Sequence, residues 1–93
     1  MHAMVVTVGV DPARSDEAGQ ILEGIVVPSS TGAEGFVRGI WLRSMDGTSG
    51  LGVVVFDTEA HARALAEQAT EGPPPGAAVT PRSIEVFEVV AEA

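Results

Sequence analysis

Chemically active side chains are scarce in this sequence, and His61 is the first of them to consider. It falls in a predicted helix, about 90° around the axis from the apolar stripe that the helix would bury, so it stands at the edge of the contact surface. A histidine in that place could serve as a general base beside a pocket, because its ring titrates near neutral pH. The alternative is that His61 is a half-buried or exposed residue on the flank of the helix and has no catalytic role.

Three further candidates belong to one predicted strand, and their chemistry suits ligand binding. Trp41 is the only tryptophan, and its indole could stack on a flat ligand, or it could fill the core or a dimer interface. Arg38 and Arg43 could clamp an anionic ligand, or they could pair with carboxylates, because acidic residues outnumber basic ones by 13 to 5. By strand alternation, Trp41 and Arg43 share one face, whereas Phe36 and Arg38 take the other.

Several residue types that are common in metal sites and in active sites are missing from the sequence. The chain has no cysteine, lysine, asparagine or tyrosine, and His2 stands in what should be a flexible start. A site built from several histidines is therefore not expected. Gly50 and Gly52 form a GxG that precedes a strand rather than joining a strand to a helix, so the dinucleotide-binding fingerprint is not met. We predict neither a metal site nor a bound cofactor.

Three glycines, Gly9, Gly39 and Gly52, interrupt segments that otherwise have strand composition. Glycine weakens a strand, and inside one it often marks a bulge or a place where a ligand or another backbone comes close. Together they could open a pocket between the sheet and its helices, or between the sheet and a partner. Bulges without a ligand are the other explanation.

The net charge limits the range of partners. Its value of −8 repels phosphate backbones and anionic membrane surfaces, so neither nucleic acid nor a membrane is expected as a partner. No apolar run approaches the roughly 20 residues of a membrane span, and the first residues lack the basic stretch that is typical of a signal peptide. We therefore expect a cytoplasmic protein.

The elements that must position these side chains follow from hydrophobic periodicity. Four segments have the β-branched and aromatic composition of strands: 4–10, 36–44, 51–56 and 84–91. Residues 16–26 place apolar side chains on one stripe and predict a helix that Pro28 ends, with a loop over 28–35. Residues 59–69 predict a second helix. Asp46-Gly47 has the composition of a hairpin turn, and the proline-rich 72–76 is a spacer.

The element order is therefore β-α-β-β-α-β, within a single domain that spans residues 1–93. This order predicts an α+β protein of the ferredoxin-like kind, with an antiparallel four-stranded sheet and both helices on one face. Residues 51–56 are apolar throughout, so both faces of that strand need to be covered. Two helices cover one face only. A second copy of the chain is the simplest cover for the other, and we predict a homodimer.

At this level the sequence resembles the dimeric α+β barrel superfamily, which includes antibiotic-biosynthesis-type monooxygenases and stress-responsive barrel proteins. The resemblance is carried by GFVRGIWLRSMDG, similar to the glycine-aromatic opening of the family's second strand, and by GLGVVVFDTEAHARAL, similar to its third strand and following helix. It covers nearly the whole chain and implies a dimeric barrel. Haem-degrading members use an Asn, Trp and His set, and this chain has no asparagine.

Two functions remain open from the residues and the resemblance together. The first is a small homodimeric barrel protein that binds a small apolar or aromatic molecule or has a structural role. The second is a cofactor-independent, monooxygenase-like oxidoreductase that acts on a planar apolar substrate. In the second case His61 would be the catalytic base. In either case Trp41, Arg38 and Arg43 are the candidate ligand-binding residues.

Overall fold

The computed structural model describes residues 1–71 and 77–93, so the predicted spacer at 72–76 lies outside the described residues. Four strands, two α-helical stretches joined by a π-helical turn, a short 3-10 turn and a third helix follow one another along the chain. In order, they are β1 (His2–Val10), η1 (Pro12–Arg14), α1 (Ser15–Ile21), η2 (Leu22–Val26), α2 (Val27–Thr31), β2 (Phe36–Arg43), β3 (Ser49–Phe56), α3 (Glu59–Glu71) and β4 (Val79–Glu88).

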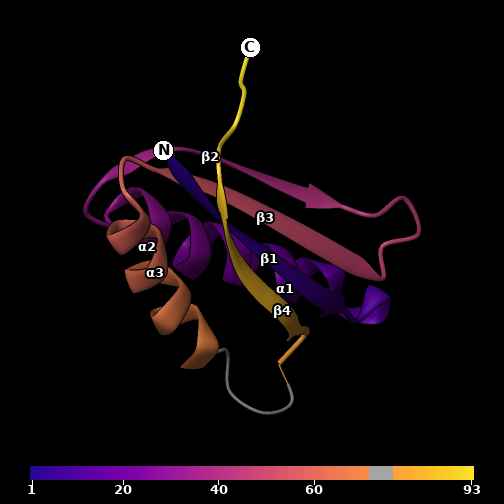
Figure 1. Cartoon of the computed structure of the whole chain (residues 1–93). Helices are drawn as coiled ribbons and strands as arrows, with labels where there is room; N and C mark the ends of the chain where they lie inside the picture. The colour runs from indigo at the N-terminus through magenta and orange to yellow at the C-terminus, as the bar shows by residue number, and fades with distance from the viewer. Residues whose placement is uncertain (72–76) are drawn as a thin grey trace.

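The strands form one antiparallel sheet in the order β2-β3-β1-β4 (Figure 1). One face of the sheet packs against α3 and against the first helical segment, the name we use for the continuous run α1-η2-α2. The predicted ferredoxin-like α+β fold is thereby confirmed. No helix in the described part of the chain is long and apolar enough to cross a membrane.

Strand β3 shows which side chains meet the helices, a point that strand alternation left undecided. Val54 and Phe56 are 0% exposed and pack with Met4 of β1 and with Ala62 and Leu65 of α3. The alternate positions therefore point to the other face of the sheet, which none of the helices within residues 1–71 and 77–93 covers. The main hydrophobic cluster of the core therefore lies on the helix-facing side, under α3.

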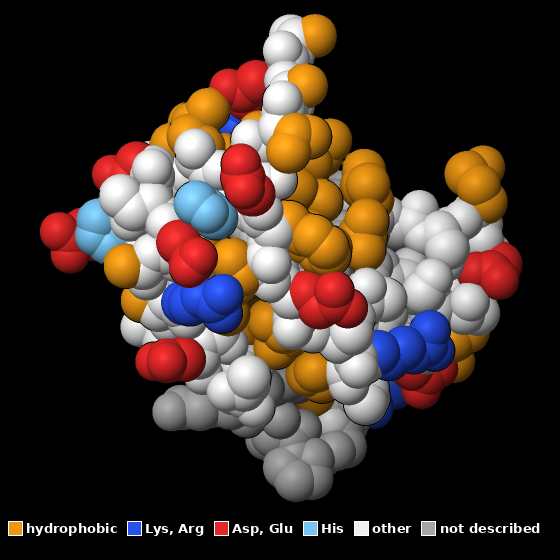
Figure 2. Space-filling model, viewed as in Figure 1, with side chains coloured by type: hydrophobic (Ala, Val, Ile, Leu, Met, Phe, Trp, Pro, Cys, Tyr) orange, Lys and Arg blue, Asp and Glu red, His pale blue; other side chains and the backbone are white. Residues whose placement is uncertain are grey.

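Apolar side chains gather on the uncovered face, which we call the open face. Ile40 and Val53 are neighbours across β2 and β3, and Phe87 lies across from Ala3 on the far side of β1. Ile40 is 55% exposed and Phe87 is 48% exposed, and Figure 2 shows orange side chains grouped over the strands. Soluble monomers rarely expose an apolar patch of this kind unless it has a partner.

The hairpin between β2 and β3 forms at the predicted turn. The Asp46 carboxylate accepts hydrogen bonds from the hydroxyl groups of Ser44 and Thr48 at 2.7 Å each and from the Thr48 backbone N–H at 3.0 Å. The bonds from Thr48 contribute most, followed by the bond from Ser44, and they lower the pKa of Asp46 to about 2. Gly47 has a φ of 75°, a conformation that glycine adopts without strain.

Pro28 does not end the first helix, and the predicted loop over 28–35 begins only after Thr31. The helix instead widens into the π turn Leu22–Val26, and Pro28 then lies in the first turn of α2. A proline has no N–H to donate, and a π turn is one of the local adjustments that accompany such a break in the regular ladder. The Ser30 hydroxyl, which is buried, donates to the Val26 carbonyl at 2.8 Å.

All four strands differ from their predicted bounds by at least one residue, and the differences in β4 and in the register of β2 are the ones that matter for the fold. β4 begins at Val79 rather than at residue 84 and includes Pro81, which is tolerated because β4 is an edge strand. In β2, the register shifts between Phe36 and Arg38, so Phe36 faces the helices together with Phe56, contrary to simple alternation. The two rings meet edge to face, with centroids 6.5 Å apart.

Candidate functional site

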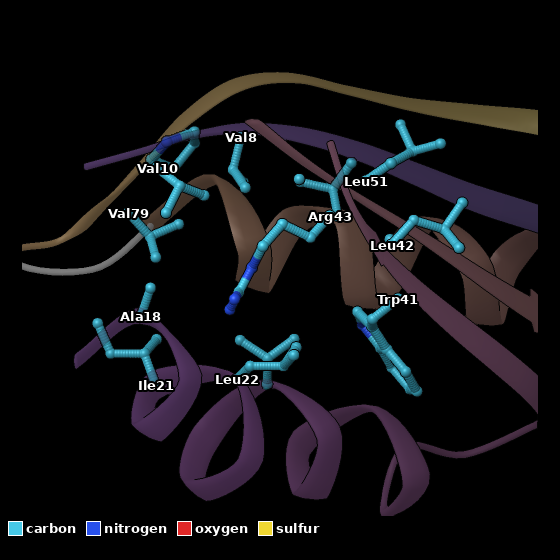
Figure 3. Close-up of a pocket in the computed structure, with 15 residues that line it drawn as sticks. Val8, Val10, Ala18, Ile21, Leu22, Trp41, Leu42, Arg43, Leu51 and Val79 are labelled. Atoms are coloured by element: carbon cyan, nitrogen blue, oxygen red, sulfur yellow. The ribbon is translucent and has the colours of Figure 1, made fainter. Parts of the chain in front are cut away.

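A pocket of about 290 Å³ lies between the sheet and the first helical segment. All four strands contribute to its walls, and α1 and η2 form the opposite side (Figure 3). Most of the lining is aliphatic: Val6, Val8, Val10, Ala18, Ile21, Leu22, Val26, Leu42, Leu51, Val79 and Pro81. Glycines 50 and 52, Trp41 and Arg43 complete it. The site is thus an apolar cavity with two side chains that can form directed polar contacts.

Trp41 lies flat against the sheet because two neighbouring positions are glycine. A Cβ atom at Gly39 would stand 2.6 Å from the indole Cη2 atom, and one at Gly52 would stand 3.1 Å from its Cδ1 atom. Both glycines therefore mark a close approach of the indole. Gly9, on the open face, also lies close to a large side chain. A Cβ atom at this position would come within 2.9 Å of the Arg82 guanidinium.

The indole nitrogen of Trp41 is buried and has no hydrogen-bond partner among the described residues. Leaving a buried N–H donor unpaired costs roughly 1–3 kcal/mol, so such groups are rare in native proteins. The indole forms part of the pocket lining, and a bound molecule with an oxygen acceptor would satisfy this donor. Among the groups that line the cavity, this unpaired nitrogen indicates most clearly that a ligand atom able to accept a hydrogen bond would be favoured there.

Arg43 stands two residues beyond Trp41 on the same face of β2, and its side chain reaches across the pocket toward Leu22 (Figure 3). No ion pair or hydrogen bond of its guanidinium occurs within residues 1–71 and 77–93. Arg38 lies opposite Val55, whereas Arg43 lies opposite Gly50, and these two positions of β3 point to opposite faces. The two arginines therefore do not form the predicted clamp, because the sheet separates them.

His61 lies elsewhere, at the start of α3. Its Nδ1 atom is 2.6 Å from the Asp57 carboxylate, and its Nε2 atom is 3.7 Å from the carboxylate of Glu34. The hydrogen bond with Asp57 raises the pKa of His61 and lowers the pKa of Asp57. The side chain is 29% exposed and does not line the pocket, so the expected approach of His61 to Trp41 is wrong. Its helix-flank position matches the non-catalytic alternative.

The pocket offers little to a metal or to haem. No group of three potential metal-ligating side chains occurs in the described part of the chain. The residues that line the cavity include no His, Cys, Met or Tyr, which are the usual axial ligands of haem iron. His2, expected in a flexible start, instead begins β1, between Phe56 and Glu88 on the neighbouring strands. The donor set of this chain does not fit a haem bound through iron in this pocket.

The helix side of the pocket was missed from sequence. Ala18, Ile21, Leu22 and Val26 read as an ordinary buried stripe, and nothing in their types separates a stripe that packs from one that borders a cavity. Gly19 and Gly24 interrupt the same segment, but neither is among the residues that line the pocket, and a Cβ atom at either would meet no atom within 4 Å, so they give no signal of the cavity. Glycine is a poor helix former, and here close packing does not explain it.

Comparisons with known proteins identify the fold of this chain but do not assign the chain to a family. No family model matches the sequence, and no curated protein matches it. The solved structure of the heme-degrader MhuD from Mycobacterium tuberculosis, with two hemes bound, is 18% identical, with a TM-score of 0.74 over 100% of this chain and 99% of that one. The ActVA-Orf6 monooxygenase of Streptomyces coelicolor, in complex with nanaomycin D, is 19% identical, with a TM-score of 0.65 over 99% and 89%.

A third neighbour is SnoaB, a cofactor-independent oxygenase from Streptomyces nogalater. It is 18% identical, with a TM-score of 0.65 over 98% of this chain and 94% of that one. These values establish a ferredoxin-like fold shared with proteins described as monooxygenases and as a heme-degrader, as the sequence resemblance implied for the fold. At such identities the likeness extends to the fold and not to the reaction.

Proposed function

We propose that this protein binds a planar, largely apolar small molecule in the pocket between the sheet and the first helical segment, and that it does so as a homodimer. The observation that carries the proposal is the buried, unpaired indole N–H of Trp41 in an otherwise aliphatic cavity. A flat ligand fits against the indole, which itself lies flat on Gly39 and Gly52. The volume of about 290 Å³ is near the lower end of small-molecule sites, which suits a ligand of two or three fused rings.

Trp41 makes this proposal easy to test, because it is the only tryptophan and the chain has no tyrosine. We expect two- and three-ring aromatic compounds to change its fluorescence saturably, with micromolar dissociation constants. Free N-acetyltryptophanamide, titrated in parallel, corrects for collisional quenching. If no planar compound produced a saturable change beyond that control, the proposed binding site would be wrong.

The dimer is proposed from the open face of the sheet. Ile40, Val53 and Phe87 share that face, and a two-fold pair would cover it with the same residues from a second copy. A stable interface of this kind buries more than about 1,000 Å² in total. We therefore predict a dimeric mass by light scattering at micromolar concentration.

Val53→Asp is the variant that isolates the interface. It places a charge on the open face and should yield a folded monomer, because an unpaired carboxylate buried between two sheets costs several kcal/mol. Ser29→Asp, which adds the same charge at an exposed position of α2, should leave the dimer intact. A monomeric wild-type protein, or a dimeric Val53→Asp variant, would contradict the proposed interface.

A second candidate function is oxygenase activity on the bound molecule. It is supported by the fold shared with proteins described as monooxygenases, one of them cofactor-independent. Oxygen consumption with a planar polyphenol and no added cofactor would support it. Because His61 is held by Asp57 away from the pocket, we predict that His61→Ala leaves any such activity unchanged. The cytoplasmic location expected from the sequence stays a prediction.

A further inference from the structure

We propose that the pocket selects planar aromatic acids, with Arg43 binding the carboxylate and the indole N–H of Trp41 donating to an oxygen of the same ligand. This inference rests on the proposed binding function and adds the chemical class of the ligand. It depends on the position of Arg43, on the residues around its side chain and on the absence of a carboxylate partner for its guanidinium among the described residues.

The placement of Arg43 brings a positive charge into an apolar wall. Its side chain extends from the end of β2 into the space between the strands and the first helical segment, with Val8 on one side and Leu22 on the other (Figure 3). No acidic side chain is among the residues that line this space. Arg43 as a whole is exposed, so water reaches one side of its side chain, whereas the aliphatic residues of the pocket exclude water from the other side, where an anion would be attracted more strongly.

Two of the other four arginines have carboxylate partners, whereas Arg43, like Arg38 and Arg82, has no ion pair within the described residues. Arg14 pairs with Glu17, and the Nε atom of Arg63 lies 3.4 Å from the Glu59 carboxylate, both within a turn of helix. In the described part of the chain, no carboxylate comes within ion-pair distance of Arg43. The protein carries a net charge of −8, so general electrostatics disfavour anions, and any preference for an acid has to come from a local group.

The spacing of the two polar groups fits a single small ligand. Trp41 and Arg43 are alternate residues of one strand, so their Cα atoms are about 7 Å apart and their side chains leave the same face. A fused aromatic ring packed on the aliphatic wall beside the edge of the indole would place a carboxylate between the two groups, within reach of the guanidinium and of the Nε1–H, which lies in the plane of the indole. The buried Nε1–H would then find its acceptor in a ligand oxygen.

The test compares 2-naphthoate with 2-naphthamide, two flat molecules of nearly equal shape that differ in charge. Binding is followed by Trp41 fluorescence in wild type, Arg43→Gln and Arg38→Gln. The two variants change the net charge equally, and Arg38 lies on the opposite face of the sheet, so it is a matched control. We expect wild type to bind the acid about tenfold more tightly than the amide, a difference that Arg43→Gln abolishes and Arg38→Gln preserves.

Arg43→Lys, which retains the charge but not the forked donor, should keep an intermediate preference, and unchanged circular dichroism spectra establish that the variants fold. Equal affinities of wild type for acid and amide would overturn this inference while leaving the binding function in place. An equal loss in Arg38→Gln and Arg43→Gln would also overturn it, because the effect would then be one of net charge. If neither compound bound, the proposed binding function would fail together with it.

Discussion

The two halves of the helix-facing side of the sheet are built differently, although they share the same four strands. Under α3, the strand residues Met4, Val54 and Phe56 pack against Ala62 and Leu65 of the helix, and together they form a closed core. Under the first helical segment, the strands present glycines and a flat indole, and a pocket of about 290 Å³ remains. The comparison indicates that the hollow remains where glycines allow the indole to lie flat on the strands, so that the ring does not fill the space below the first helical segment.

The largest expected effect comes from removing a side chain from the packed half. Phe56→Ala should lower the free energy of unfolding by about 3 to 5 kcal/mol, because Phe56 is 0% exposed and its neighbours cannot close the resulting cavity. Leu22→Ala, in the wall of the pocket, should cost about 1 kcal/mol or less, because its side chain is only partly buried and alanine favours a helix. Urea denaturation of both variants measures the difference, and equal losses would show that the two halves are packed alike.

Replacing an alanine by leucine on each of the two helices tests the same comparison by adding side-chain volume instead of removing it. Ala62→Leu adds volume to a 0% exposed site in the closed core and should destabilise the protein by about 1 to 3 kcal/mol. Ala18→Leu adds the same volume beside the pocket, where the longer side chain has space to enter, and should be nearly neutral. Thermal unfolding gives both values, and fluorescence titration should show weaker ligand binding in Ala18→Leu alone. A large loss of stability in Ala18→Leu would mean that the cavity is not accessible from α1.

The smallest expected effect concerns the ion pair at the start of α3, in the packed half. The pKa of His61 is raised above its ordinary value of 6.5 by Asp57, so its contribution to stability is complete below that value and is lost as pH rises through the folded pKa. The pKa of Asp57 is lowered from 3.8, so its contribution is present above that value and is lost as pH falls through the folded pKa.

The pair therefore stabilises the protein most between those two ordinary values. The melting temperature of His61→Gln should fall furthest below that of wild type between pH 3.8 and pH 6.5, and the gap should close as pH rises through the folded pKa of His61. Over the same range, the affinity for the neutral 2-naphthamide should stay constant, because His61 does not line the pocket. A change in that affinity with the titration of His61 would show that the two halves are coupled.

The sequence was sufficient for the fold because its patterns are local and consistent. The apolar run 51–56, the turn at Asp46-Gly47 and the stripe of α3 each indicate their element without reference to the rest of the chain. Alternation also placed Trp41 and Arg43 on one face of β2, as the structure has them. It did not predict the register shift after Phe36, because a bulge depends on pairing with β3 rather than on the types of residue in the strand.

The candidate site could be predicted only in part, because its residues are brought together by tertiary contacts. The orientation of His61 depends on Asp57 and on the close approach of Gly35, whose carbonyl accepts a hydrogen bond from the Asp57 N–H at 2.9 Å. The continuation of the helix through Pro28 depends on the π turn, for which no sequence signal is known that outweighs the proline. The approach of Gly35 to Asp57 and His61 joins segments distant in sequence, and periodicity contains no information on such a contact.

The most direct measurement of the central claim uses the single indole of the chain. In a two-dimensional ¹H–¹⁵N NMR spectrum, the Nε1–H of Trp41 gives one indole signal, and the claim is that this donor is unpaired in the free protein and meets a ligand oxygen in the pocket. Addition of 2-naphthoate should move that signal downfield, together with the amide signals of Gly52 and Leu22 and without those of His61 and Val53. An indole signal that stays in place while residues of the open face or the start of α3 shift would show that the ligand binds elsewhere, and the assignment of the pocket as the functional site would be wrong.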